Sequence, residues 1–355
     1  MVGDLSHHTD LLLRWYSVNK RKLPWRQTQD PYKVWLSEVI LQQTRVAQGL
    51  PYYNKFIERF PSVHDLSNAS IQEVLLHWQG LGYYTRARNL HKCAKTIVSE
   101  FDGIFPGSYS ELIRLPGIGP YTAAAIASIS FNEEKPVIDG NVFRVLSRLF
   151  DINEEIHSLS GRKYFEKLAN IMIPSKNPGD FNQAIMEFGA LQCIPKNPGC
   201  DICDLRSLCL SYSNKNQHER PVHQKKTYKS TRYFDYLVFE DEKGLYLQKR
   251  EKKDIWKGLY DFYLLESKTK KNDLTEILRD NKLFRNIDLH VNHIREYKHI
   301  LTHQIIFATF YHVRFTNYHL TANILLNTGK FYSLNEIEAL PKPVLIDKYL
   351  KEEIF

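Results

Sequence analysis

The sequence predicts a multidomain protein, with an all-α domain followed by a smaller α+β domain. Residues 1–210 show the apolar spacing of helices, and residues 233–355 change to short alternating runs typical of strands. Between them, residues 211–232 are polar and carry six Lys or Arg against one Glu, which is the composition of an interdomain linker. A chain of 355 residues also exceeds what one hydrophobic core usually serves.

The overall charge favours a polyanionic partner. The formal net charge is +8 and the pI is about 9.0, with Lys and Arg spread along the chain. No apolar run approaches the roughly 18 residues that a membrane span needs, and residues 1–10 are polar, unlike a secretory segment. We therefore expect a soluble, cytoplasmic protein without membrane contact, associated with the nucleoid if the source is a bacterium.

The first candidate functional stretch is the basic and aromatic turn at residues 21–26. It reads Arg-Lys-Leu-Pro-Trp-Arg and follows a short helical pattern. Arg and Trp side by side can hold a phosphate and stack a base. A surface loop around a buried Trp explains this stretch equally well when it is taken alone.

Glu38 is the first candidate catalytic residue. Asp30 and Pro31 are typical of a helix start, and helical spacing places Glu38 beside Val34 and Leu41. A carboxyl group among apolar side chains has a raised pKa and can remain protonated as a general acid. The simpler alternative is a Glu at the edge of the apolar stripe that meets solvent.

Two glycine-containing segments suggest contact with nucleic acid. Residues 79–88 combine glycines with paired tyrosines and two arginines, a mixture that suits stacking and backbone contact. Residues 108–122 predict a short capped helix, a Pro-Gly-Ile-Gly-Pro turn and an Ala-rich helix, so that free N–H groups could face a phosphate. Ordinary helix junctions would produce similar patterns.

Asp139 is the second candidate catalytic residue. It precedes a helical pattern that begins at Asn141, and free N–H groups at a helix N-terminus favour an ionised carboxylate. Simple capping of the helix would also account for an Asp at this position. If Glu38 is protonated and Asp139 is ionised, however, the pair provides the acid and the anion that cleave glycosidic bonds.

Four of the five cysteines form a tight cluster, which predicts a metal site in a reducing compartment. They are Cys193, Cys200, Cys203 and Cys209. Four thiolates can hold zinc or a four-iron cluster. Only one Cys-x-x-Cys pair is present, and this favours iron–sulfur over a two-knuckle zinc site.

The C-terminal region predicts a small α+β domain. We expect strands at residues 234–240, 244–249, 259–265 and 305–313, and helices at 274–282 and 344–353. No glutamate-rich helix suited to Mg²⁺ occurs in residues 233–355. This domain is therefore expected to recognise a ligand without hydrolysing it.

Taken together, these motifs resemble the helix-hairpin-helix DNA glycosylases, and in particular the adenine DNA glycosylases of the MutY type. The resemblance is dense over residues 10–210 and includes Leu-Pro-Trp-Arg, Gly-Leu-Gly-Tyr-Tyr, Leu-Pro-Gly-Ile-Gly, Asp-Gly-Asn-Val and the cysteine spacing. It implies an all-α helix-hairpin-helix glycosylase domain with an iron–sulfur loop (residues 1–210) and a Nudix-like lesion-recognition domain (residues 233–355). The related endonuclease III branch has a Schiff-base lysine where this chain has Tyr121, so the resemblance implies base removal without strand cleavage.

The resemblance also assigns roles to residues. Glu38 would protonate a flipped-out adenine, Asp139 would stabilise or trap the sugar cation, and Tyr121 and Asn141 would assist. The implied adenine pocket comprises Arg21, Leu23, Trp25, Arg26 and Gln183. The DNA contacts that we expect are Gln42, Gln43, Tyr83, Arg86, Arg88, Leu115, Gly117, Gly119 and Thr122, with Gln43 and Tyr83 acting as wedges.

The implied ligands follow from the same family. They are one [4Fe–4S] cluster on Cys193, Cys200, Cys203 and Cys209, an optional monovalent cation at the hairpin, and double-stranded DNA carrying adenine opposite 8-oxoguanine or guanine. A monomer would suffice. The family reads 8-oxoguanine through a Phe-Ser-His turn, and the corresponding residues here are Leu301, Thr302 and His303. Thr302 keeps a hydroxyl, whereas Leu301 loses the aromatic contact.

Three other functions remain open. A bifunctional lyase of the endonuclease III type conflicts with Tyr121. A non-catalytic iron–sulfur DNA-binding module would leave Glu38 and Asp139 unexplained. A Nudix-type nucleotide hydrolase lacks its acidic helix.

Overall fold

The chain forms two compact units in the computed structural model, which describes residues 5–156, 158–222, 229–270, 274–279, 289–315 and 328–355. The first unit comprises residues 1–68 and 89–225, and the second comprises 69–88 and 226–355. We did not expect residues 69–88 to group with the C-terminal residues. Within the described residues, no helix is both long and apolar enough to cross a membrane.

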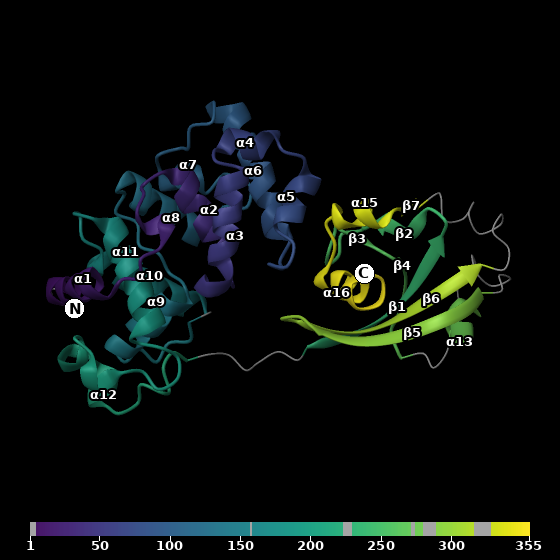
Figure 1. Cartoon of the computed structure of the whole chain (residues 1–355). Helices are drawn as coiled ribbons and strands as arrows, with labels where there is room; N and C mark the ends of the chain where they lie inside the picture. Colours follow the sequence, from purple (N-terminus) through teal and green to yellow (C-terminus); the bar gives the residue numbers. More distant parts are fainter. Residues whose placement is uncertain (1–4, 157, 223–228, 271–273, 280–288, 316–327) are drawn as a thin grey trace. The chain divides into compact units, whose positions relative to one another are not determined.

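The first unit is built from helices (Figure 1). Its α-helices are α1 (Ser6–Asn19), α2 (Pro31–Leu41), α3 (Val46–Arg59), α4 (Val63–Asn68), most of α6 (Thr85–Phe101), α7 (Tyr109–Leu112), α8 (Pro120–Phe131), α9 (Gly140–Leu149), α10 (Leu159–Met172), α11 (Pro178–Leu191) and α12 (Leu210–Ser213). Short 3-10 helices are η1 (Pro24–Arg26), η2 (Cys200–Ile202) and η3 (Arg206–Leu208).

Helices α2, α8 and α11 form the centre of this unit. Helix α2 packs against α3 and α8, and α11 packs against α1, α8 and α9. Nearly the whole length of α2 and of the Ala-rich α8 is buried, as expected for helices that are apolar on all sides. The central helices therefore provide rigid positions for side chains from distant parts of the sequence.

The predicted helix–hairpin–helix is present. The Ser108 side chain accepts a hydrogen bond from the backbone N–H of Glu111 and caps α7. Gly117 adopts a φ of +77°, and a Cβ atom there would lie 2.5 Å from Cβ of Asn89, so both conformation and space require glycine. Gly119, which precedes α8, differs because a Cβ atom would meet nothing within 4 Å.

The first half of the predicted linker is fastened to the helical unit. Asp151 accepts hydrogen bonds from the side chains of Asn214, Asn216 and Arg220. At the other end of the predicted linker, the first strand already begins at Ser230. Both ends of the predicted linker, residues 211–232, therefore belong to the units that they adjoin. Residues 223–228 lie outside the described part of the chain.

The second unit contains a mixed sheet with helices. Its elements are α5 (Ile71–His77), β1 (Ser230–Asp241), β2 (Gly244–Lys249), β3 (Tyr260–Asp261), β4 (Tyr263–Ser267), α13 (Leu274–Arg279), β5 (Leu289–Ile300), β6 (Gln304–Phe315), β7 (Lys330–Tyr332), α15 (Leu334–Glu338) and α16 (Val344–Glu353). The strand order is β3-β2-β1-β6-β5, with β4 pairing with β1 and β7 with β2. Strands β1 and β6 are parallel, and the other pairs are antiparallel.

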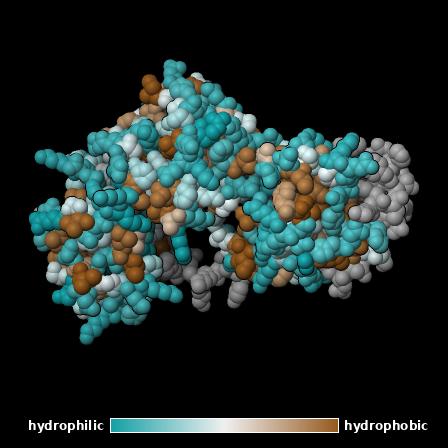
Figure 2. All heavy atoms as spheres, viewed as in Figure 1, coloured by the Kyte–Doolittle hydropathy of each residue, from teal (hydrophilic) through white to brown (hydrophobic). Residues whose placement is uncertain are grey.

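Both faces of the sheet bury side chains. On one face, Tyr349 of α16 stacks on Phe310 of β6 with ring centroids 4.3 Å apart. On the other face, Leu274 of α13 joins a cluster with Leu237 and Val313 (Figure 1). Figure 2 shows that the visible outer surface is mainly hydrophilic, with scattered apolar side chains. The predicted fold class, an all-α domain followed by an α+β domain, is confirmed.

Candidate active site

A cavity of about 180 Å³ in the helical unit brings together side chains that are far apart in the sequence. All nine residues that we predicted for catalysis and for the base pocket line it: Glu38, Asp139, Tyr121, Asn141, Arg21, Leu23, Trp25, Arg26 and Gln183. They come from α2, α8, α9 and α11 and from the turn around η1. The packing of the central helices therefore creates one site from five separate segments.

Glu38 lies in the interior of α2 and is 8% exposed. The pKa of its carboxyl group is raised to about 7, mainly by burial and to a smaller extent by the nearby Asp139. The Tyr121 hydroxyl donates a 2.7 Å hydrogen bond to Oε2 of Glu38, and this bond lowers the pKa. Burial prevails, so Glu38 can carry a proton near neutral pH, as we expected for a general acid.

Asp139 occupies the N-cap of α9 and has a different environment. Its carboxylate accepts hydrogen bonds from the backbone N–H groups of Asn141 and Val142, at 2.9 and 2.8 Å, and from the Asn141 side chain at 2.8 Å. Burial raises the pKa of Asp139 above its ordinary value, and these three donors and Arg144 act in the opposite direction. Glu38 has one such donor, so the surroundings of Asp139 favour the charged form more strongly.

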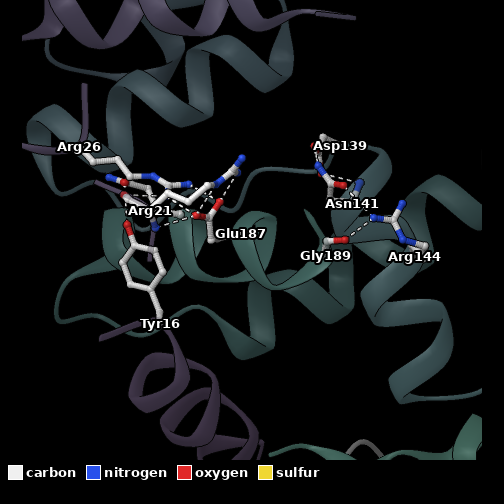
Figure 3. A network of polar contacts seen from close by, with 9 residues as sticks. Tyr16, Arg21, Arg26, Asp139, Asn141, Arg144, Glu187 and Gly189 are labelled. Carbon is white, nitrogen blue, oxygen red and sulfur yellow. Dashed lines mark hydrogen bonds and ion pairs between the residues drawn. The ribbon is translucent and has the colours of Figure 1, made fainter. Parts of the chain in front are cut away.

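Arg144 links the catalytic end of α9 to the cysteine loop. Its guanidinium group donates to Oδ1 of Asn141 at 2.8 Å, to the carbonyl of Gly189 at 2.6 Å and to the carbonyl of Cys193 at 2.8 Å (Figure 3). Because Asn141 in turn donates to Asp139, Arg144 fixes the orientation of the amide beside the carboxylate. We did not predict this residue, although its spacing of three from Asn141 places both on one helix face.

Glu187 is the second residue of the site that we did not predict. It is 1% exposed, lines the cavity and accepts hydrogen bonds from both Arg21 and Arg26 (Figure 3). Burial raises the pKa of Glu187, but the bonds from the two arginines outweigh burial and lower it to about 2. Its spacing of four from Gln183 on α11 was the available signal. This charged group fixes both arginines at the cavity wall.

The four cysteines predicted as ligands line a common cavity of about 30 Å³ next to α9. Burial raises the pKa of Cys203 to about 12, and the neighbouring thiols contribute to the rise. Arg148 holds the same loop through 2.7 Å and 3.0 Å bonds to the carbonyls of Ile194 and Pro195. Within the described residues, no three potential ligands form a group that could hold a metal ion. The donor set nevertheless fits a four-cysteine site, because all four sulfur-bearing side chains meet at one cavity.

Two of the DNA contacts predicted in the helical unit are residues with buried side chains, and these contacts stay a prediction. Leu115 is 5% exposed and Thr122 is 1% exposed, so neither side chain can form an outer contact surface. Gln42 donates a 3.3 Å hydrogen bond to Oγ1 of Thr122 and thereby braces the start of α8. Backbone groups and the two hairpin glycines remain available to a partner.

The two predicted wedge residues share an uncommon conformation. Gln43 has a φ of 54° and Tyr83 has a φ of 51°, which is the left-handed region that non-glycine residues rarely adopt. Both side chains are exposed, Tyr83 by 42%. An exposed side chain on a strained backbone is typical of a functional position, and the wedge roles stay a prediction.

Arg86 and Arg88 both make contacts within the second unit. The Arg86 guanidinium lies 5.1 Å from the ring centroid of Trp78 and 5.5 Å from that of Tyr83, and the residue is 9% exposed. Arg88 donates a 2.8 Å bond to the carbonyl of Lys257. These contacts hold both arginines within the second unit and let Arg86 support Tyr83, and the DNA contacts of both residues stay a prediction.

Leu301, Thr302 and His303 form the hairpin turn between β5 and β6. The N–H of Leu301 donates to the carbonyl of Gln304, and the N–H of Ser230 donates to the carbonyl of His303. Within the second unit, the Thr302 hydroxyl is hydrogen-bonded to the hydroxyl of Tyr83. A predicted wedge and a predicted lesion contact are therefore neighbours.

Comparisons with known proteins agree with this geometry. Residues 36–171 match the HhH-GPD superfamily base excision DNA repair proteins, and residues 236–352 match the NUDIX domain. Among solved structures, a thermostable thymine-DNA glycosylase superposes with a TM-score of 0.55 and 27% identity, over 59% of this chain and 96% of its own. An endonuclease III bound to DNA gives 0.52 at 22% identity, over 61% of this chain and 99% of its own, which shows the fold alone.

The matched family and the named relatives define the class of protein, a helix-hairpin-helix DNA glycosylase that acts as a hydrolase. An adenine DNA glycosylase of Buchnera aphidicola subsp. Baizongia pistaciae is 38% identical over 347 residues, covering 96% of this chain and 94% of the relative. The human adenine DNA glycosylase is 41% identical over 227 residues, covering 61% of this chain and 42% of the relative. The chain belongs to the adenine DNA glycosylase family.

Proposed function

We propose that this protein hydrolyses the N-glycosidic bond of adenine that is mispaired with 8-oxoguanine or guanine in duplex DNA. The observation that carries the proposal is the placement of Glu38 and Asp139 in one cavity with unlike surroundings. One carboxyl group is buried with a single hydroxyl donor, and the other accepts three N–H bonds. Such pairs separate into an acid and an anion.

In the proposed reaction, an adenine nucleotide flipped out of the duplex enters the cavity. Glu38 donates its proton to N7 of the base, so that the bond from C1′ to the base breaks and neutral adenine leaves. Asp139 stabilises the positive charge left on the sugar, or bonds to C1′ until water replaces it. Asn141, oriented by Arg144, would hold the carboxylate and the sugar in register.

Tyr121 supports a monofunctional enzyme. It stands where the endonuclease III branch has its lysine, and burial raises its pKa well above the ordinary value. A neutral phenol cannot form a Schiff base with the sugar. Its hydroxyl instead donates a hydrogen bond to Glu38. This bond would orient the Glu38 carboxyl group toward the adenine.

The hairpin supports binding of duplex DNA. Gly119 supplies no side-chain cap to α8, and no packing contact of the described chain requires glycine there. Open space beside free N–H groups at a helix start suits a DNA phosphate. Gln43 and Tyr83 would wedge into the duplex, a monovalent cation could join the hairpin, and a monomer would suffice in the cytoplasm or at the nucleoid.

The cysteine site supports one [4Fe–4S] cluster, held by Cys193, Cys200, Cys203 and Cys209. Thiols bind metal as thiolates, because the metal charge displaces the proton. When bound, the cluster supplies a rigid cross-link for the loop. Arg144 and Arg148 join that loop to α9, so the cluster would stabilise the helix that begins at Asp139.

The turn from Leu301 to His303 would contact the base opposite the adenine. Its position at a hairpin tip and the bond between Thr302 and Tyr83 support this assignment. Replacing Thr302 and His303 with Ala should reduce the preference for 8-oxoguanine over guanine. An unchanged preference would remove this turn from the proposal.

The deciding experiment is a single-turnover assay on duplexes with adenine opposite 8-oxoguanine, guanine or thymine, each followed by alkali to cleave abasic sites. We expect release from the first two only, and none from Glu38→Gln although it still binds DNA. Binding without release by the native chain would favour a DNA-binding module. An adduct trapped by borohydride on abasic DNA would favour a lyase.

A further inference from the structure

A second hollow lies beside the catalytic cavity in the helical unit. It measures about 350 Å³, within the range of small-molecule sites. Arg26, Ile129 and Gln183 line both the hollow and the cavity, so these three side chains form a shared wall. The hollow contains neither of the two catalytic carboxyl groups, and the proposed chemistry leaves it unexplained.

The hollow opens at the end of α8 that is distant from the hairpin. Asn132, which lines the hollow, follows the last residue of α8, whereas Gly119 of the hairpin precedes the first. Helix α8 has 12 residues, which corresponds to a length of about 18 Å. A duplex held at the hairpin would therefore cover the front of the catalytic cavity and leave the hollow accessible.

The lining of the hollow suits a free nucleobase. Gln27, Gln29, Asn132, Asn177 and Gln183 contribute five side-chain amides. An amide offers a donor and an acceptor side by side, the pairing that adenine presents at N6 and N7. No Lys lines the hollow, so a phosphate would find Arg26 alone, and Glu187 already holds that residue.

The shared wall has one weakly held member. Arg26 makes two hydrogen bonds to Glu187 and lies over the ring of Tyr16. Gln183 accepts a single 2.9 Å hydrogen bond, from the Tyr16 hydroxyl. Rotation of Gln183 costs one neutral hydrogen bond and would join the two spaces. Gln183 is the side chain best placed to act as a gate.

From this geometry we infer that the hollow is a second base site and an exit, through which the excised purine leaves while the protein still holds abasic DNA. The inference rests on the proposed glycosylase function. Release through the front would require the DNA to leave first, because the emptied nucleotide still occupies the mouth. Release through the hollow lets the base leave while the DNA is still bound.

The test uses the full chain on bead-bound duplex that carries radiolabelled adenine opposite 8-oxoguanine. After a single turnover, label in the supernatant reports base release, protein on the beads reports DNA binding, and alkali reports excision. For the native chain, we expect label to appear while protein remains bound. Gln29→Trp fills the hollow, and its base release should slow to the rate at which the protein leaves the beads.

One control accompanies this variant. Ser175→Trp adds the same ring at an exposed residue outside the hollow, so it should match the native chain. Label that stays with the native protein until it dissociates overturns the inference, as does rapid release by Gln29→Trp. Failure of the proposed function looks different, because alkali would then reveal no abasic sites.

Discussion

Replacing Glu38 with Gln should stabilise the protein in a pH-dependent way. Burial raises the pKa of Glu38 from 4.5 to about 7. Between these values, the native protein holds a proton that the unfolded chain has lost, so native stability falls as pH rises through this window. At about 1.4 kcal/mol per unit, the loss reaches about 3 kcal/mol above pH 7. Gln keeps the shape of the side chain but has no charge to desolvate.

The stability difference between Glu38→Gln and the native chain should therefore be small near pH 5 and approach about 3 kcal/mol at pH 8. Urea unfolding at several pH values, followed by tryptophan fluorescence, measures this difference. The result that refutes the reasoning is a difference that stays constant from pH 5 to 8, because Glu38 would then ionise as it does in water. An acid role at neutral pH would fall with it.

Glu187→Gln provides a contrast within the same cavity. Its pKa is lowered to about 2, so its contribution to stability is complete above pH 4.5 and is lost only as pH falls from there toward 2. This variant should be less stable than the native chain by about 3 kcal/mol or more, since Arg21 and Arg26 lose their partner. The difference should not change between pH 5 and 8, in contrast to Glu38→Gln.

Three further predictions concern catalysis and the metal site. Tyr121→Phe removes a hydrogen bond that lowers the pKa of Glu38, so the alkaline limb of single-turnover base release should move to higher pH; a limb that stays in place contradicts this. Arg144→Lys should slow base release by about tenfold to a hundredfold with unchanged DNA affinity, because Asn141 loses its orientation; equal loss of affinity would indicate a structural role. Cys209→Ser should reduce iron per chain and the visible absorption band, whereas full zinc content would exclude the cluster.

The sequence indicated residues that line one cavity in the structure, but it missed part of the sheet. Strand β5 was missed because Val291, Ile294, Tyr297 and Ile300 recur every three residues, a spacing closer to a helix than to a strand. A register shift between Val291 and His293 interrupts the alternation once, and the apolar Ile294 and Ile300 lie exposed on the strand. The short strand β7 and helix α15 were also missed, because elements of three to five residues leave no periodicity.

Contacts between residues that are distant in the sequence could not be predicted either. The motif around Arg86 predicted a DNA contact because arginine beside tyrosine suits a phosphate and a base, but Trp78, eight residues earlier, takes its guanidinium. For Glu187 the sequence offered only its spacing of four from Gln183, and nothing in the sequence shows which cations pair with it. Its partners Arg21 and Arg26 become apparent only when α11 packs near η1.

The two candidate catalytic carboxyl groups owe the difference in their surroundings to their positions within helices. Inside α2, every backbone N–H near Glu38 is already used by the helix, so burial acts on the carboxyl group with little compensation and keeps it protonated. At the start of α9, two N–H groups without helical partners bind Asp139 directly. The acid and the anion therefore arise from helix interior and helix terminus, and the residue pairs Asp30-Pro31 and Asp139-Gly140 indicate both positions in the sequence alone. What the fold adds is the packing of α2 beside α8 and of α9 beside α11, which turns two ordinary local environments into one reactive pair.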